Sequence, residues 1–153
     1  MTGLEHATPP IFDLQISAFP STPLSLGLVC DFVSRFPPFE GFEFRQMTVA
    51  LRYQLETKSH LVAGLDDRIV GYLGWIRTTR RIAEAWVADA GPLTAVEEGV
   101  DALAPTILVT EHSRYALPLV RCAKGLNRGL SVYWKRQFSD GRADIKRSVR
   151  KRT

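Results

Sequence analysis

Apolar positions between residues 25 and 57 recur with the spacing of two amphipathic helices. Ser25 is well placed to cap the first helix. Pro37-Pro38 is expected to end it, because proline lacks an N–H and disfavours helical geometry in the residue before it. A second helix is expected over 43–57. The apolar positions are Leu28, Val29, Phe32, Val33 and Phe36 in the first helix, and Phe44, Met47, Leu51 and Leu55 in the second.

Residues 60–76 predict a β-hairpin. The β-rich runs 60–63 and 69–76 lie on either side of a polar turn at Asp66-Asp67. Gly71 and Gly74 inside the second run indicate a bulge, or a close approach of the backbone to a ligand.

The rest of the chain alternates between helix and strand. Residues 79–90 are expected to be helical and 91–105 a loop with room for one helical turn. A short buried strand is expected at 106–110, then a helix that Ser113 caps and Gly125 ends. The last expected elements are a strand at 130–134, a turn at Asp140-Gly141 and a strand at 145–149, and residues 1–24 are expected to form an extended arm.

This order predicts a single α/β domain over residues 25–150. Its strands are expected to form a mixed sheet with helices on its faces. The strand–helix–strand unit from 106 to 134 is a crossover connection, which is expected to be right-handed.

Composition agrees with one globular domain in the cytoplasm. The chain has 153 residues, of which 45% are apolar and 24% are charged. No apolar run reaches the roughly 18 residues of a membrane span, and the start of the chain lacks the pattern of a secretion signal. Cys30 and Cys122 are expected to be buried free thiols, and their spacing predicts no metal site.

The net charge of +4 is unevenly distributed. Residues 121–153 contain 11 Lys/Arg and two Asp/Glu, whereas residues 1–120 contain nine Lys/Arg and 14 Asp/Glu. A basic C-terminal third attracts an acidic partner, for which nucleic acid, an anionic membrane and an acidic carrier protein are all candidates.

The order of elements resembles the GNAT acyltransferases, and several residues resemble one branch of that fold, the toxin-activating lysine acyltransferases. The resemblance covers about residues 25–150. It rests on Leu26-Gly27, on Pro37-Pro38, on the run Val70-Gly71-Tyr72-Leu73-Gly74-Trp75 and on Thr106 to Thr110.

This resemblance implies that a fatty acyl group is transferred from acyl carrier protein to a lysine of a target protein, such as a repeat toxin. The donor would be the acyl-phosphopantetheine of the carrier, with no other cofactor. The resemblance further implies a cytoplasmic homodimer. The family's histidine after the first helix is missing, however, since residues 36–41 read Phe-Pro-Pro-Phe-Glu-Gly. Its acidic residue after the central strand also lacks a counterpart in Ser113-Arg114-Tyr115.

Glu111 and His112 are therefore the candidate catalytic residues. They follow the central strand, where the GNAT-like sheet opens to the acyl donor, and a histidine there could deprotonate an amine. Ser113, Arg114, Trp75 and Tyr72 are candidates for binding the donor, partly through amides at the following helix start. The alternative interpretation of residues 111–113, which the sequence favours, is a polar turn with a capping serine.

CoA is the less favoured donor, because residues 111–117 contain no glycine and the usual pyrophosphate loop of GNAT proteins is glycine-rich. Arg128, Lys135, Arg136 and Arg142 are candidates for binding the carrier protein or another anion. Nucleic acid is a less favoured partner, and a solvated strand edge would also explain these cations. Two further hypotheses are a catalytically degenerate protein that binds an acidic partner, and a GNAT protein that acylates a small amine from acyl-CoA.

Overall fold

A computed structural model describes residues 13–137 and 143–148; for 136–137 and 143–148 it describes the backbone alone. The six strands form one sheet in chain order. They are β1 (Gln15–Ser17), β2 (His60–Leu65), β3 (Arg68–Thr78), β4 (Ala102–Thr110), β5 (Ser131–Gln137) and β6 (Ala143–Ser148). The helices are α1 (Pro23–Val33), α2 (Phe44–Glu56), α3 (Arg80–Val87) and α4 (Ala116–Leu126), with 3₁₀ turns η2 (Phe39–Gly41) and η3 (Ser113–Tyr115).

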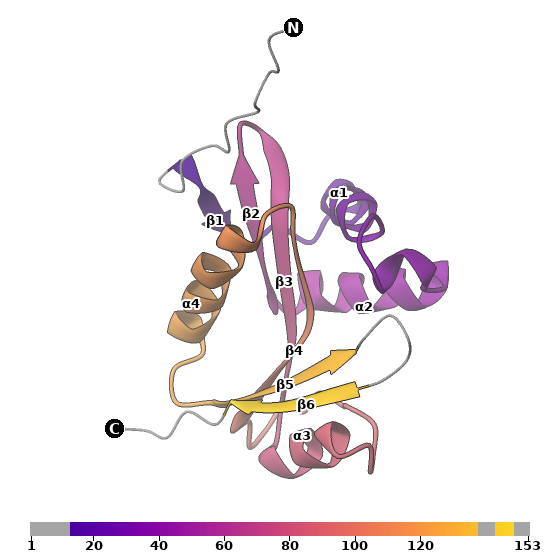
Figure 1. The fold of residues 1–153 in the computed structure, drawn as a ribbon, viewed down its shortest axis with the longest axis vertical. Helices are drawn as coiled ribbons and strands as arrows, with labels where there is room; N and C mark the ends of the chain where they lie inside the picture. The colour runs from indigo at the N-terminus through magenta and orange to yellow at the C-terminus, as the bar shows by residue number, and fades with distance from the viewer. Residues whose placement is uncertain (1–12, 138–142, 149–153) are drawn as a thin grey trace, which may run out of the picture.

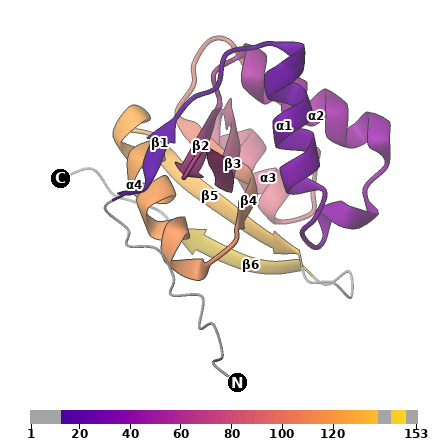
Figure 2. The same cartoon turned by 90° about the horizontal axis from the view of Figure 1, so that it is seen from above.

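Helices cover both faces of the sheet (Figures 1 and 2). Helices α1 and α2 lie on one face, over a buried cluster that includes Leu51, Tyr72 and Val109. Helix α4 lies on the other face, over a second cluster that includes Trp75 and Leu119. Helix α3 packs where β4 and β5 begin, with Ala83, Val87, Ala102 and Tyr133 in contact. The predicted α/β domain with a mixed sheet is confirmed.

The second helix, the β2–β3 hairpin and α3 lie where the sequence predicts them. Asp66 and Asp67 form the hairpin turn, and both have positive φ angles of 49° and 59°. Aspartate is one of the few residues other than glycine that enters this region, because its short side chain can bond to the local backbone. The predicted turn at Asp140-Gly141 lies outside the described residues.

Three predictions about the start of the chain are wrong. Residues 15–17 are not part of an arm, because they pair antiparallel with β2 and extend the sheet. Thr22, not Ser25, caps α1: the Thr22 hydroxyl accepts the Ser25 backbone N–H at 3.1 Å. Ser25 lies inside the first turn and is buried. The helix also ends at Val33, before Pro37-Pro38 is reached.

The region around β4 differs from its predicted form as well. The strand begins at Ala102, so residues 102–105 belong to the sheet and not to a loop. Ser113 does not cap α4, because η3 intervenes between β4 and the helix. Pro118 fits in the first turn of α4, where a missing N–H costs no intrahelical hydrogen bond. Gly125 lies inside α4, whose C-terminal cap is Asn127.

Both cysteines are free thiols, as predicted, but neither is fully buried: Cys30 is half-buried and Cys122 is exposed. Burial raises the pKa of the Cys30 thiol. Among the described residues, no helix is long and apolar enough to cross a membrane. Within the same residues, no group of three or more His, Cys, Asp or Glu side chains could hold a metal ion.

Candidate functional site

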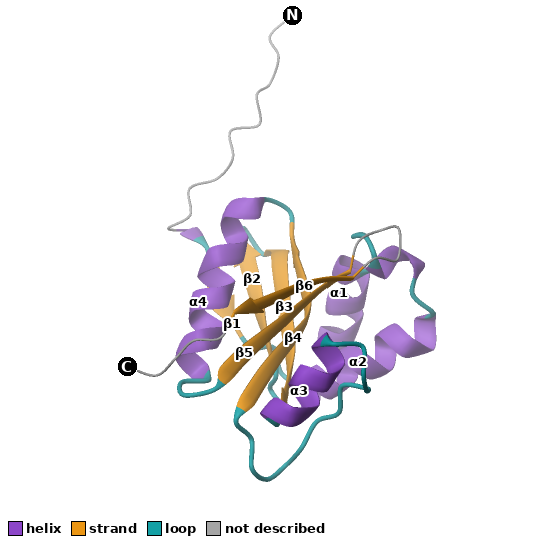
Figure 3. Cartoon of the chain, turned by 60° about the horizontal axis from the view of Figure 1, so that its bottom comes forward, coloured by secondary structure: helices purple, strands orange, loops and turns teal. Residues whose placement is uncertain are grey.

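The sheet opens between β4 and β5, which run parallel. Their ladder consists of two residue pairs, Ala102 with Ser131 and Leu103 with Val132, although β4 continues to Thr110 and β5 to Gln137. Figures 1 and 3 show the two strands taking different directions beyond these pairs. From Ala104 onward, the β5 side of β4 has no strand partner among the described residues.

A bulge in β4 lies within this open stretch. Against β3, Gly74 is opposite Ile107 but Trp75 is opposite Pro105, so Thr106 is the extra residue. Pro105 supplies no N–H to either neighbouring strand, and proline occurs inside sheets chiefly at edges and bulges. The sequence Pro105-Thr106 therefore interrupts the ladder at the point where β4 and β5 have separated.

A chain of hydrogen bonds supports the bulge from the side of α2. Tyr72 Oη donates to Gln54 Oε1 at 2.7 Å, and Gln54 Nε2 donates to Thr106 Oγ1 at 2.9 Å. Gln54 and Tyr72 are buried, and Thr106 is half-buried. Burial raises the pKa of the Tyr72 phenol, which keeps it neutral and able to donate. Gln54 thus connects α2, β3 and the bulge.

His60 belongs to the same region but has a structural role. Its Nε2 accepts the Phe19 backbone N–H at 2.8 Å, and its Nδ1 donates to the Gln54 carbonyl at 2.9 Å. This arrangement requires the neutral ring, and burial lowers the pKa of His60 accordingly. Only 1% of His60 is exposed, so the ring is enclosed by the elements that it joins.

The loop after β4 presents His112 to solvent. The His112 ring contacts the Tyr115 ring edge-on, with centroids 5.7 Å apart. Glu111 points elsewhere: both its carboxylate oxygens accept from Arg68 Nη1, at 2.5 and 2.6 Å. Arg68 begins β3, so this ion pair fixes the loop to the hairpin. Glu111 therefore forms its ion pair with Arg68 at the start of β3, while the His112 ring packs on Tyr115.

Two buried donors under α4 have no hydrogen-bond partner among the described residues, Trp75 Nε1 and Tyr115 Oη. Both side chains belong to the cluster under α4 and are fully buried. Unsatisfied buried donors are rare in native proteins, because each costs about 1–3 kcal/mol.

The structure brings some of the predicted residues together and separates others. Glu111, His112, Ser113 and Arg114 share the loop after β4, and the Arg114 guanidinium lies 5.5 Å from the Tyr115 ring centre. Trp75 and Tyr72 lie in clusters on opposite faces of the sheet, so they cannot bind one small group jointly.

The predicted anion-binding residues are dispersed as well. Arg128 lies after α4. Lys135 on β5 pairs with Asp89 and lies over Trp86. The side chain of Arg136 and the whole of Arg142 lie outside the described part of the chain.

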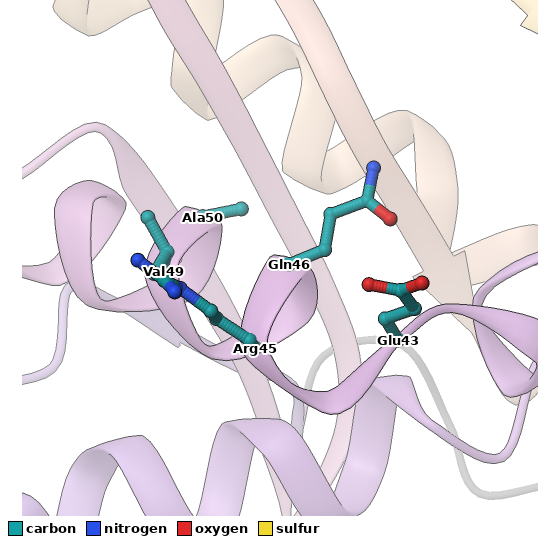
Figure 4. Close-up of a pocket in the computed structure, with 5 residues that line it drawn as sticks. All are labelled: Glu43, Arg45, Gln46, Val49 and Ala50. Atoms are coloured by element: carbon teal, nitrogen blue, oxygen red, sulfur yellow. The ribbon is translucent and has the colours of Figure 1, made fainter.

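Two of the shallow depressions on the described surface lie on helices and not between β4 and β5. One, of about 480 Å³, lies at the start of α2 and is shown in Figure 4. It is lined by Glu43, Arg45, Gln46, Val49 and Ala50. The other, of about 340 Å³, lies on the outer face of α4.

Gln54, Thr106 and Tyr115 are not among the site residues predicted from the sequence. Gln54 falls on the buried face of a predicted helix, where a glutamine needs a polar partner, and this was an available signal. Thr106 follows a proline within a strand, which is typical of a bulge. Nothing in the local pattern distinguishes Tyr115 from an ordinary core residue.

The fold is similar to solved structures of the GNAT class. A mosquito arylalkylamine N-acetyltransferase-like 5b protein has a TM-score of 0.56 at 11% identity, over 80% of this chain and 76% of that one. A Drosophila melanogaster polyamine N-acetyltransferase has a TM-score of 0.56 at 15% identity, over 82% and 77%. The GNAT-like decarboxylase GphF, in complex with isobutyryl-CoA, has a TM-score of 0.56 at 15% identity, over 83% and 67%.

No protein-family profile and no curated protein sequence matches the chain. Similarities at 11–15% identity show the fold, and they confirm the predicted GNAT-like architecture. None of these three structures is a toxin-activating lysine acyltransferase, so that closer resemblance remains a prediction.

Proposed function

We propose that this GNAT-fold chain transfers an acyl group from the thioester of an acyl carrier protein to a lysine amine of another protein. The observation that supports this most directly is the separation of β4 from β5 after two residue pairs. It leaves one side of β4 unpaired over several residues, and such an edge can hydrogen-bond an extended acyl-pantetheine chain.

In the proposed reaction, the lysine nitrogen attacks the thioester carbonyl. A C–N bond forms, the C–S bond breaks and the carrier leaves as its free thiol. His112 takes the proton that the amine loses, because it is the exposed histidine beside the open end of β4. Tyr115 holds the His112 ring through the edge-on contact. Glu111 is assigned to loop anchoring, since Arg68 occupies both its oxygens.

Two observations support a carrier protein over free CoA as the donor. The loop from Glu111 to Ala116 lacks the glycines whose backbone amides would approach a pyrophosphate closely. Helix α4 and the turn after it present Arg121, Lys124 and Arg128, a set of cations suited to an acidic protein.

The test uses purified protein, carrier proteins loaded with acyl chains of graded length, and lysine-containing peptides as acceptors. The expected result is amine-dependent release of carrier thiol and an acyl mass gain on lysine. His112→Ala is expected to lower the rate at least about tenfold, because a general base contributes at least that much. Glu98→Ala, at an exposed loop position, is the matched control and should retain the rate. Absence of thiol release for every chain length would refute the proposal.

A second candidate function is binding without catalysis. It is favoured by the ion pair that occupies Glu111 and by the location of both depressions on helix surfaces, away from β4 and β5. It predicts salt-sensitive binding of an acidic protein with no turnover. Acyl transfer by the purified protein would exclude it.

A further inference from the structure

The outer face of α4 forms a groove that the reaction proposed above does not use. Leu117, Arg121 and Lys124 are four and three residues apart, so they project from one face of the helix. With Val120, Gly125 and Arg128 they line the depression of about 340 Å³. These six residues are called the α4 groove below.

The α4 groove is positively charged. Its three cations, Arg121, Lys124 and Arg128, take part in none of the ion pairs found among the described residues. The sequence contains no Asp or Glu between Glu111 and Asp140, so no carboxylate of α4 or its flanking turns lies among them. Unneutralised cations on one face are a steering surface for an acidic partner.

The groove also has an apolar component. The large apolar side chain of Leu117 is 54% exposed, and Val120 beside it is half-buried. At Gly125 the lining has no side chain, and an added Cβ would meet nothing within 4 Å. Cations beside a small apolar patch are complementary to an amphipathic helix with carboxylates on its polar side.

We propose that the α4 groove docks an acidic helix of the carrier protein that delivers the acyl group. The identity of the partner rests on the function proposed above. The position of the groove supports it, because α4 begins directly after the loop that holds His112. A carrier on α4 would therefore lie beside the open end of β4.

Other anionic partners fit the groove less well. Nucleic acid is usually held by cations together with aromatic side chains on which bases stack, and none of the six lining residues is aromatic. Insertion into a membrane surface requires a broad apolar face, whereas Leu117 and Val120 are the two large apolar residues of the lining.

The first experiment measures binding of acyl carrier protein, free and acylated, by titration calorimetry. The triple variant Arg121→Glu/Lys124→Glu/Arg128→Glu is expected to weaken the Kd at least about tenfold, because each reversal replaces attraction by repulsion. The matched control reverses three exposed cations on and just after α2, Arg45→Glu/Arg52→Glu/Lys58→Glu, and should change the Kd by less than about twofold. Equal losses in both variants would refute the docking site.

A second experiment separates docking from chemistry. With acyl carrier protein as donor, the α4 triple variant is expected to raise KM at least about tenfold and to leave kcat within about twofold. With the small thioester acyl-N-acetylcysteamine, which has no protein to dock, kcat/KM should be unchanged. If neither donor is used, the transferase proposal fails, while the binding titration still decides whether the carrier docks on α4.

A third variant, Gly125→Gln, tests the groove without changing its charge. Glutamine is a better helix former than glycine and has open space at this position, so the fold should be retained. A side chain added at this lining position should nevertheless weaken carrier binding at least about fivefold, because it occupies space that the partner helix would fill. Carrier binding at wild-type strength in a folded Gly125→Gln protein would overturn the proposal. The proposal would also fail if the α4 groove bound a single-stranded RNA or phosphatidylglycerol vesicles and did not bind the carrier.

Discussion

At the scale of single residues, Gln54 determines how the bulge of β4 is held. Its side-chain amide accepts from Tyr72 and donates to Thr106, so both halves of the amide are used. Only 1% of Gln54 is exposed, and a buried amide without these partners would cost about 1–3 kcal/mol. The position of Thr106 is therefore coupled to α2, the helix that carries Gln54 and lies on the opposite face of the sheet from α4.

Only glycine fits at position 74, because the Gln54 side chain occupies the space where a Cβ would lie. A Cβ at Gly74 would lie 1.9 Å from Gln54 Oε1 and 2.7 Å from Nε2. Gly74→Ala is expected to lower the free energy of unfolding by about 1–3 kcal/mol, since the buried amide must move and lose its partners. Urea denaturation measures the change.

Gly27→Ala is the matched control for this prediction. Gly27 lies in α1, and an added Cβ there would meet nothing within 4 Å. The substitution is expected to raise stability by about 0.5–1 kcal/mol, because alanine restricts the unfolded chain. A Gly74→Ala protein as stable as the Gly27→Ala protein would contradict the packing described for Gln54.

At the scale of elements, the start of α1 shows what a helix cap depends on. Thr22 and Ser25 both precede apolar helical positions and both can accept a backbone N–H. Thr22 has the extended backbone of a cap, with φ −132° and ψ 158°, and Pro23 follows it at the first helical position, which proline favours. Ser25 is buried inside the first turn instead.

Thr22→Ala is expected to lower the free energy of unfolding by about 1 kcal/mol, because the Ser25 N–H loses its acceptor. Thr22→Ser should retain most of the stability. Chemical denaturation measures the free energy of unfolding of each variant. Ser21→Ala, at an exposed position just before the cap, is the control. If Ser21→Ala proved as damaging as Thr22→Ala, the assignment of the cap would be wrong.

At the scale of the whole molecule, the opening of the sheet follows from three separate features. The β4–α4–β5 connection makes the two strands parallel, and Pro105 with the bulge at Thr106 interrupts regular pairing. Strand β5 then pairs with β6 on its other side and packs with α3, so its direction is set away from β4. An acyl-pantetheine chain is the kind of ligand that this opening would accommodate in the proposed function.

This arrangement predicts how the protein responds to donors without a carrier. Acyl-CoA is expected to raise Tm no more than acyl-pantetheine at the same concentration, because residues 111–116 offer no glycine-rich loop to the added pyrophosphate. Thermal unfolding followed by fluorescence measures both shifts, and desulfo-CoA controls for binding of the nucleotide alone. A distinctly larger shift with acyl-CoA would favour the alternative in which CoA is the donor.

The sequence by itself determined the order of the elements from α1 onward. Apolar periodicity located α2, α3 and the β2–β3 hairpin, because helix and strand spacing are local properties of the chain. It also placed Glu111 and His112 at the end of the central strand. It did not place Gln54 at the bulge, since that contact joins residues 52 positions apart.

The tertiary structure alone decided which of these residues meet. It paired Glu111 with Arg68 across 43 positions, separated Tyr72 from Trp75 on opposite faces, and ended the β4–β5 ladder after Leu103. Strand register and divergence depend on how whole layers pack against one another. A pattern of neighbouring residues carries no such information, because the free energy that fixes the register comes from contacts between distant segments.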